Sequence, residues 1–447
     1  MERRWSYLAL ALTCAYFLAL AHEGLGAYFM PDDMMNLYGY WTQPFEWSSL
    51  VNFFGDVFRP GGALFYLPLF HWFGFDPLPF RIACFALLLF NLWVAWRVAA
   101  RLSGSAQVAA LATLLFAYHG AFVDLYFSTG TVYDLLCFPL TYGAALLYFD
   151  WRRQPWLRIP AMILLYVLAL DTKEIAAALP LILAAYEALY GNWRRRAVEW
   201  VPLAVVIAIT AVYTASRLTG LVGGNPAYRP VFTLEQLIIG LKFYMGALIY
   251  RSEQTPLWLS VALFAGPGVI ALTARSRLLA LSWCIFVAGA LTVLFIPTRG
   301  GFVLYLPWLG AALYLAVAIM GVVGGIRRQV SGFRFEVAWF WLAFVGLLGL
   351  LVAIHLPRVG RARNWVDREQ SKVRTVVEGV AARYPKLPAG SRLLLRNNPF
   401  DEGDYAPLMA LRLYYRDKEL QVDTAAKEGA EYFATIELPA PQRNSPM

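Results

Sequence analysis

Two adjacent aspartates, Asp32 and Asp33, follow the first long apolar stretch of the chain, in the segment PDDMMNLYGYW. A carboxylate beside a bilayer is costly to place and therefore suggests chemistry. Because a carboxylate held against a hydroxyl can remove its proton, the pair is suited to a general base with a supporting acid or metal ligand. The structural alternative is that the aspartates cap a helix that starts after Pro31, near Met34.

A second group of candidates lies in the segment LDTKEIAAALP, which contains Asp171, Lys173 and Glu174. Lys173 is a cation that could hold a phosphate oxygen. Asp171 and Glu174 have the spacing of a capping box, which would give them a purely structural role at a helix start. The two interpretations are compatible, and both remain open.

Further charged residues stand beside turns or at the starts of apolar stretches. Arg59 in DVFRPGG and Arg299 in IPTRGGF adjoin Pro/Gly turns, where a guanidinium could bind a lipid phosphate. Their alternative role is that of surface arginines that snorkel to the interface. Asp134 begins an apolar stretch and Asp124 precedes it, and an acid at a helix start also complements the helix dipole.

Composition identifies the class of protein that must position these residues. Of the 447 residues, 60% are hydrophobic and only 15% are charged. Such a chain cannot cover itself with a soluble surface, which predicts an all-α polytopic membrane protein. About eleven apolar runs could each contribute a membrane span. They are Trp5–Ala21, Phe80–Trp96, Ala106–Tyr118, Thr131–Phe149, Ile159–Leu170, Ile175–Tyr190, Ala197–Ala215, Leu257–Ala274, Leu278–Ile296, Phe302–Val323 and Val337–Leu356.

Arginine clusters predict the orientation of these spans. They occupy alternate connections, which the positive-inside rule assigns to the cytoplasm. The clusters are Arg3/Arg4, Arg97/Arg101, Arg152/Arg153, Arg194/Arg195/Arg196, Arg275/Arg277 and Arg327/Arg328. The N-terminus is then cytoplasmic and the segment after Leu356 is exterior, together with all the acidic candidates. The net charge of +9 is therefore a topology signal, and no nucleic-acid footprint is visible.

The chain divides by composition into a membrane domain, 1–356, and a small exterior domain, 357–447. In the second segment 27 of 91 residues are charged, against 40 of the first 356. Residues 391–397 and 430–438 have strand character and residues 407–417 have helix character, which predicts a compact α/β unit. In the membrane domain, the long exterior stretch 22–79 should contain interfacial helices, including Gly62–Phe73. The N-terminus also has signal-peptide character, but we expect the first span to be retained.

The ordered motifs resemble those of the membrane-embedded C-type glycosyltransferases. They are the Asp-Asp pair after the first span, FRPGG near residue 60, YFSTGTVYDLL (126–136) and LDTKEIAAALP (170–180). The resemblance covers roughly residues 1–190 and is strongest to the protein O-mannosyltransferase-like group and its relatives with tetratricopeptide tails. Two features depart from that pattern: this chain has no tetratricopeptide array, and related groups have Asp-Glu where it has Asp-Asp.

The resemblance implies roles for particular residues. Asp32 is similar to the catalytic base of these enzymes and Asp33 to the acid beside it. Arg59 and Lys173 match positions near the lipid phosphate, and Asp134 matches an acid in the loop before the fourth span. We expect Asp32, Arg59 and Lys173 to open onto one cavity at the outer membrane boundary. Arg299 is a further candidate for the phosphate, with Asp171 and Glu174 in support.

These observations predict an inverting glycosyltransferase of a bacterial inner membrane, which moves a monosaccharide from a polyprenyl-phosphate donor to an exterior hydroxyl. Displacing a phosphate needs no strong general acid, because a cation can meet its charge. No cofactor or metal is demanded, although a divalent metal is compatible. The acceptor and the oligomeric state are left open. The rival functions are a transporter or flippase for a lipid-linked sugar, and a non-catalytic envelope assembly protein.

Overall fold

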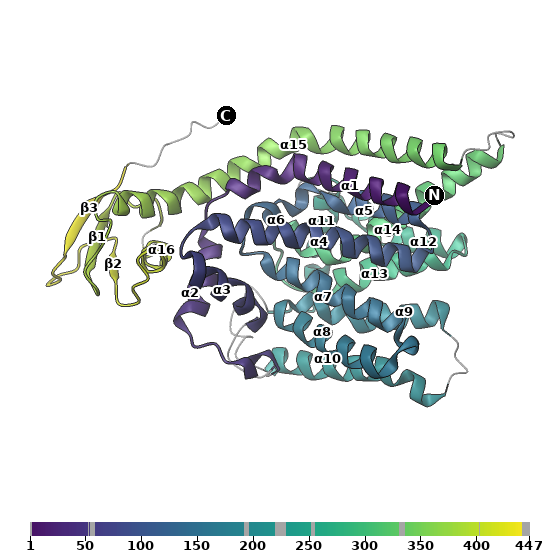
Figure 1. The fold of residues 1–447 in the computed structure, drawn as a ribbon, viewed down its shortest axis with the longest axis horizontal. Helices are drawn as coiled ribbons and strands as arrows, with labels where there is room; N and C mark the ends of the chain where they lie inside the picture. Colours follow the sequence, from purple (N-terminus) through teal and green to yellow (C-terminus); the bar gives the residue numbers. More distant parts are fainter. Residues whose placement is uncertain are drawn as a thin grey trace.

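A computed structural model describes residues 2–51, 53, 59–191, 196–219, 229–251, 255–329, 336–401 and 403–439. Most of the helices run side by side along one direction and form an elongated bundle (Figure 1). A small α/β unit projects from one end of the bundle, and the N-terminus lies at the other end. The expected all-α polytopic architecture with a C-terminal α/β unit is therefore confirmed.

The bundle contains fifteen of the described α-helices, joined by short 3₁₀ segments. The first helices are α1 (Glu2–Ala21), α2 (Pro31–Thr42), α3 (Ala63–Phe73), α4 (Pro77–Ser103), α5 (Ala106–Ala117), α6 (Val123–Phe127), α7 (Val132–Phe149) and α8 (Pro155–Thr172). They are followed by α9 (Leu179–Tyr190), α10 (Val201–Thr219), α11 (Leu234–Leu248), α12 (Leu257–Thr273), α13 (Arg277–Leu294), α14 (Tyr305–Gln329) and α15 (Glu336–Ala381). The 3₁₀ segments are η1 (His22–Gly26), η2 (Trp47–Leu50), η3 (Pro60–Gly62), η4 (Gly120–Phe122), η5 (Trp151–Arg153), η6 (Glu174–Ala178), η7 (Ala197–Trp200) and η10 (Gly301–Leu304).

All eleven predicted apolar runs are helical, but fewer of these helices are long enough to span a bilayer alone. Eight helices among the described residues pass that test, or nine if α5 and the bent segment after it form one broken span. The remaining runs form α9, with 12 residues, and α12, with 17. The expected number of about eleven is therefore higher than the eight to nine that the structure supports. The many long apolar helices make this an integral membrane protein.

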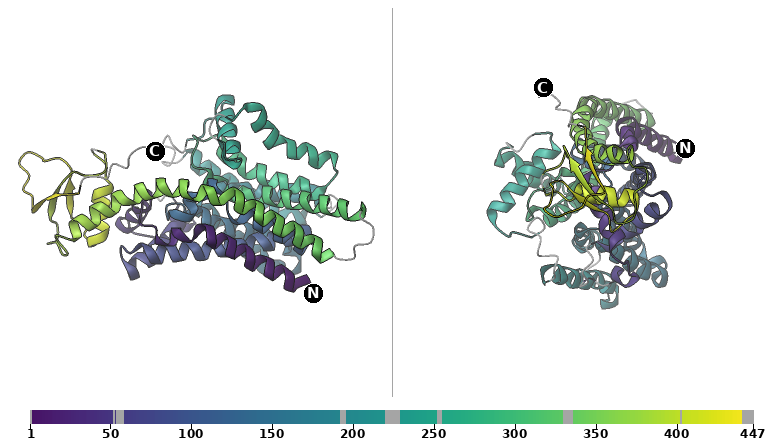
Figure 2. Two further views of the ribbon diagram at one scale, coloured as in Figure 1. Left: turned by 90° about the horizontal axis from the view of Figure 1, so that it is seen from above. Right: turned by 90° about the vertical axis from the view of Figure 1, so that its left-hand side faces the viewer.

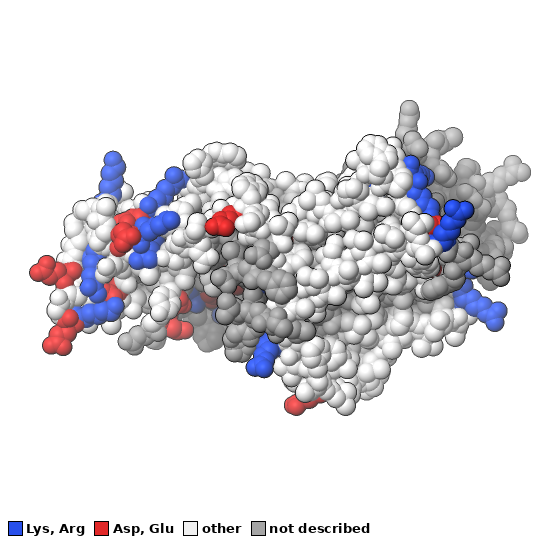
Figure 3. All heavy atoms as spheres, turned by 90° about the horizontal axis from the view of Figure 1, so that it is seen from below, with Lys and Arg blue, Asp and Glu red and all other residues white. Residues whose placement is uncertain are grey.

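Charged side chains gather at the two ends of the molecule. On the face shown in Figure 3, Lys, Arg, Asp and Glu lie over the α/β unit and at the opposite end, and the surface between them is mostly uncharged. An uncharged belt between two charged ends is the surface that a bilayer requires. The arginines Arg194 and Arg195, and the Gly/Pro-rich turn at 220–228, lie outside the described residues.

The last long helix, α15, joins the membrane bundle to the α/β unit. With 46 residues it is about 69 Å long, more than twice the roughly 30 Å of a hydrocarbon core. Figure 2 shows it passing along the bundle and continuing to the sheet. The compositional boundary at 357 falls inside this helix, so one continuous helix belongs to both segments.

The α/β unit has a three-stranded parallel sheet in the order β2-β1-β3. Its elements are β1 (Arg392–Arg396), α16 (Ala406–Tyr415), β2 (Gln421–Asp423) and β3 (Ala434–Glu437). The predicted strands at 391–397 and 430–438 and the predicted helix at 407–417 are thus present, whereas the short β2 was not predicted. Leu393 pairs with both Val422 and Ala434. Apolar residues of this sheet and of α15 belong to the same buried cluster as the bundle core.

The α/β unit packs on the part of the bundle that carries the aspartate pair. Arg412 of α16 donates to the Tyr38 hydroxyl on α2 at 2.5 Å, and Arg416 donates to the Phe70 carbonyl on α3 at 2.9 Å. The ammonium of Lys418 lies 5.1 Å from the ring centre of Trp41. The unit and helices α2 and α3 therefore form one end of the molecule.

Candidate active site

The two aspartates lie in the first turn of α2, where Pro31 is the first helical residue. Pro is favoured at that position because its fixed φ suits a helix. It also lacks the N–H group, which would have no partner within the helix there. The side chain of Asp33 accepts a hydrogen bond from the Met30 N–H at 3.0 Å and so caps the helix. The structural role foreseen for the pair is thus present, but it belongs to Asp33 and the helix begins before Met34.

Asp33 is fully buried and its carboxylate is saturated with donors. One oxygen accepts from Met30 and from Arg81, at 3.0 and 3.2 Å, and the other from the Ser128 hydroxyl and the Gly130 N–H, both at 2.6 Å. Arg81 is 1% exposed and also donates to the carbonyls of Ala27 and Tyr28. Asp33 therefore ties α2 to α4 and to the loop before α7.

Asp32 has the opposite environment. Its side chain is exposed, and within the described part of the chain its carboxylate accepts no hydrogen bond and makes no ion pair. Although this side chain reaches solvent, the surrounding protein removes part of its hydration, which raises its pKa above the ordinary value. The neighbouring charge of Asp33 raises the pKa further, while Arg299 acts in the opposite direction. A carboxylate with free oxygens and a raised pKa is a better proton acceptor than a saturated one.

Arg299 reaches this region from the loop before η10. The backbone N–H of Arg299 donates a hydrogen bond to the Tyr244 hydroxyl at 3.3 Å. The following Gly300 lies so close to Asp124 that a Cβ there would stand 2.8 Å from the carboxylate. This tight approach explains the glycine in the TRGG motif and brings the loop to the acid before α7. Arg299 is thus the predicted phosphate-binding cation whose charge acts on Asp32.

Arg59 is buried and pairs with Glu174 through both ends of its guanidinium. Nη2 and Nε lie 2.8 and 3.3 Å from the two carboxylate oxygens. Burial by itself would raise the pKa of Glu174, but the charge and hydrogen bonds of Arg59 lower it to about 2. The Arg59 carbonyl accepts from the Tyr40 hydroxyl at 2.7 Å, and its guanidinium lies 5.1 Å from the ring centre of Tyr133.

The Pro-Gly-Gly sequence after Arg59 allows close packing. A Cβ on Gly61 would stand 2.8 Å from the Thr172 methyl group, and one on Gly62 would stand 2.5 Å from the Tyr40 hydroxyl and the Tyr133 ring. Glycine is therefore required at both positions for η3 to lie against α2, α7 and α8. These contacts place Arg59 beside the segment that carries Glu174.

Lys173 forms a buried ion pair with Asp134, and both side chains are less than a tenth exposed. The ammonium also lies 4.9 Å from the ring centre of Phe302. The predicted capping box between Asp171 and Glu174 is wrong, because α8 continues through Asp171 to Thr172 and η6 begins at Glu174 without a side-chain cap. Asp171 is instead buried, and one of its oxygens has no hydrogen-bond partner among the described residues.

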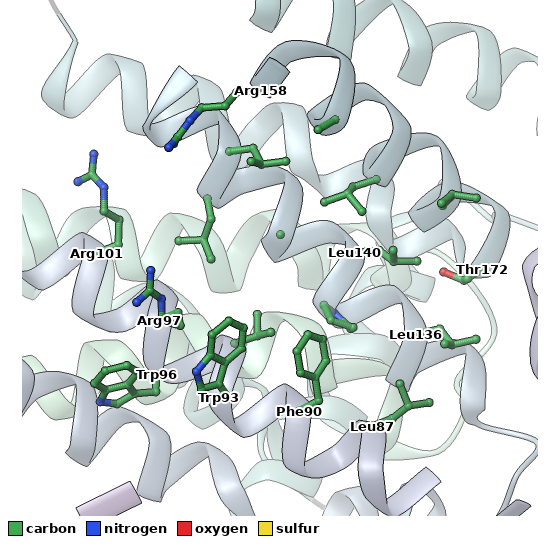
Figure 4. Close-up of a pocket in the computed structure, with 18 of the residues that line it drawn as sticks. Leu87, Phe90, Trp93, Trp96, Arg97, Arg101, Leu136, Leu140, Arg158 and Thr172 are labelled. Carbon is green, nitrogen blue, oxygen red and sulfur yellow. The ribbon is translucent and has the colours of Figure 1, made fainter. Parts of the chain in front are cut away.

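A large apolar groove of about 1570 Å³ runs between α4, α7 and α8. Thr172 lines one end, and Arg97, Arg101 and Arg158 line the other (Figure 4). Gly61, which also lines the groove, lies beside Thr172. Asp32, Arg59 and Lys173 do not line this groove, and the cavity that we expect them to share stays a prediction. The groove nevertheless begins two residues from Arg59 and one residue from Lys173.

Several residues of this site were missed by sequence reasoning. Arg81, Ser128 and Gly130 hold Asp33, and Tyr133 donates to Asn36 of α2 at 3.0 Å. Arg81 carried a usable signal, since a cation inside an otherwise apolar run needs a buried partner. Ser128 and Gly130 gave none, because only the fold brings them to α2. No group of three or more His, Cys, Asp or Glu side chains within the described ranges could hold a metal ion.

Comparison with known proteins adds a likeness of fold. The apo crystal structure of the oligosaccharyltransferase of Archaeoglobus fulgidus superposes with a TM-score of 0.52 at 10% sequence identity. The match covers 94% of this chain and 65% of that structure, so the chain spans slightly less than two thirds of its length. No protein-family model and no curated protein matches the sequence. The chain thus has an overall fold similar to that of this archaeal oligosaccharyltransferase.

Proposed function

We propose that this protein is a membrane glycosyltransferase that transfers a monosaccharide from a polyprenyl phosphate to an acceptor hydroxyl, with inversion. The observation that carries the proposal is the contrast between the neighbouring aspartates. Asp33 is saturated with donors, whereas the carboxylate of Asp32 is exposed and has no partner among the described residues. Asp33 then fixes the start of α2, and Asp32 is left to act as the base. The fold likeness to an oligosaccharyltransferase supports the same class of reaction.

The reaction requires one proton transfer and one displacement. Asp32 accepts the proton of the acceptor hydroxyl while the oxygen of that hydroxyl attacks the anomeric carbon of the sugar. The bond between the anomeric carbon and the oxygen of the lipid phosphate breaks on the opposite face. The leaving phosphate keeps its electron pair and is stabilised by a cation. Arg299 is assigned this contact first, since its charge acts on Asp32. Arg59 and Lys173 remain candidates, each at present paired with an acid.

The apolar groove supports a lipid-linked donor. Its lining residues Gly61 and Thr172 are two residues from Arg59 and one residue from Lys173 along the chain. Its walls along α4, α7 and α8 are apolar. Such walls let the prenyl chain stay in an apolar environment within the membrane while its sugar lies outside. The proposed orientation places this end on the exterior face of a bacterial inner membrane.

The donor class can be tested with membranes that contain the full chain. Radiolabelled monosaccharides on polyprenyl phosphate, and the same sugars on nucleoside diphosphate, are supplied separately. We expect label transfer only from polyprenyl phosphate, with the product anomer opposite to that of the donor. Transfer from the nucleotide sugar alone, or retention of configuration, would overturn the proposal. Exposed Glu46 provides a matched control, since Glu46→Gln removes an acid near α2 and should leave transfer unchanged.

A further inference from the structure

The groove has a second end, opposite to the aspartates, where arginines gather. We call Arg97, Arg101, Arg153 and Arg158, together with Asp150, the arginine cluster; all five line the groove. Figure 4 shows Arg97, Arg101 and Arg158 at one end of the groove and Leu87, Leu136 and Thr172 at the other. Helix α8 has 18 residues and rises about 27 Å, close to the roughly 30 Å of a hydrocarbon core. The arginine cluster therefore lies at the opposite membrane surface from the proposed active site.

The arginine cluster has more positive charge than its own acid can balance. Asp150 lies 3.0 Å from Arg101, 3.7 Å from Arg158 and 4.0 Å from Arg153. Arg97 is exposed, makes no ion pair with any described residue, and has its guanidinium 5.8 Å from the ring centre of Trp93. Four guanidinium groups and one carboxylate leave a formal charge of +3. Since each guanidinium has five N–H donors, several donors remain for an external anion.

The wall beside the arginine cluster is apolar and faces the bilayer. Phe90 and Trp93 of α4 and Leu157 of α8 line the groove and are exposed. An apolar channel that ends in a cationic cluster at a membrane surface is complementary to an amphiphile with an anionic head and long acyl chains. A soluble anion would make no use of the apolar walls, and a nucleic acid could not enter the hydrocarbon.

We propose that the arginine cluster binds the phosphate of an anionic glycerophospholipid, whose acyl chains lie in the groove along Phe90, Trp93 and Leu157. The cytoplasmic leaflet is rich in anionic lipids, and the expected orientation puts the cluster there. The lipid is distinct from the proposed donor, because the donor phosphate must lie near Asp32, at the far end of the groove. Binding of this second lipid does not depend on the proposed reaction.

The test measures lipid retention by the purified full chain in detergent. Fluorescent phosphatidylglycerol and phosphatidylcholine with identical acyl chains are offered, and bound lipid is counted after gel filtration. We expect wild-type protein to retain phosphatidylglycerol at least fivefold better than phosphatidylcholine. The double variant Arg97→Gln/Arg158→Gln should lose this preference, and Arg97→Gln alone should reduce it. The single variant removes an exposed side chain that forms no ion pair with the residues that the structure describes, so its fold is expected to be intact.

Arg152 provides a matched control. It is adjacent to Arg153 in η5, pairs with Glu199 at 2.9 Å, and is not part of the groove. Arg152→Gln should retain the wild-type preference. An equal loss in Arg152→Gln, or an unchanged preference in the double variant, would overturn the proposal. Displacement of the bound phosphatidylglycerol by polyprenyl phosphate more readily than by unlabelled phosphatidylglycerol would also overturn it, because the groove end would then belong to the donor class of lipid.

Discussion

The two ends of the apolar groove use charge in different ways. Near the aspartates, buried cations are matched one to one with acids, whereas at the opposite end three exposed or half-buried arginines share the single carboxylate of Asp150. The matched pairs are Arg81–Asp33, Arg59–Glu174 and Lys173–Asp134. Buried matched pairs hold elements together, because an unpaired charge is costly there. Shared and exposed arginines have donors left over for a ligand.

This difference makes Asp32 an exception within its own end of the molecule. The neighbouring acids Asp33, Asp134 and Glu174 each bind a cation, while Asp32 binds none among the described residues. Asp124 and Asp171 also form no ion pair among the described residues, but Asp171 is buried and Asp124 is partly buried, whereas Asp32 is exposed and can reach a substrate. The comparison therefore supports assigning structure to Asp33 and chemistry to Asp32.

The largest effect should come from breaking the most buried pair. Arg81→Leu leaves Asp33 as an uncompensated buried charge, and we expect a loss of about 3–5 kcal/mol in the free energy of unfolding. Thermal unfolding of the purified protein in detergent measures it. A Tm equal to that of the wild type would contradict the structural role given to Asp33 and Arg81.

A smaller loss in the free energy of unfolding is expected when a side chain is added to a closely packed glycine at the same end of the groove. Gly61→Ala places a Cβ 2.8 Å from the Thr172 methyl group, within the close contact of η3 with α8. Overpacking of this kind costs about 1–3 kcal/mol. Gly26→Ala is the matched control, since a Cβ there would meet nothing within 4 Å. Equal stability of the two variants would show that η3 is free to move away.

The ion pair of Arg59 and Glu174 should make the stability of the folded protein depend on pH. The pKa of Glu174 falls from 4.5 to about 2 in the folded protein, so the folded state is favoured above pH 4.5 and loses that advantage as the pH falls toward 2. The difference in Tm between wild type and Arg59→Gln should therefore be full at neutral pH and shrink as the pH falls from 4.5 to 3. A difference that does not change over this range would contradict the ion pair.

The smallest effect should be found in the arginine cluster. Arg153 is 75% exposed and lies 4.0 Å from Asp150, which Arg101 and Arg158 also approach. Arg153→Gln should change the free energy of unfolding by less than about 0.5 kcal/mol. A loss comparable with that of Arg81→Leu would remove the distinction between the two ends.

Features that depend on local sequence were predicted well. Hydropathy within one segment located all eleven apolar runs that form helices, and β-propensity located β1 and β3. The number of spans was less accessible. The run Ile175–Tyr190 is divided between η6 and α9, and α12 follows its predicted run closely but has only 17 residues. The strand β2 has three residues, too few for a pattern. The composition change near Pro357 marks where α15 becomes charged, and the helix continues through it.

The charge pairing of the site could not be predicted. Lys173 and Asp134 are 39 residues apart, and Arg59 and Glu174 are 115 apart. From the sequence each cation was a candidate for a lipid phosphate, whereas the fold supplies each with an acid. Similarly, the adjacent aspartates looked equivalent until the helix geometry turned Asp33 toward Arg81 and left Asp32 exposed.

The central claim is that Asp32 acts on the substrate while Asp33 holds the fold. Transfer from polyprenyl-phosphate sugar and thermal unfolding should be measured in parallel for Asp32→Asn, Asp33→Asn and the Glu46→Gln control. We predict that Asp32→Asn keeps the wild-type Tm and loses about 10²–10⁴-fold in transfer rate, while Asp33→Asn is destabilised. An Asp32→Asn protein that transfers sugar at the wild-type rate would contradict the assignment.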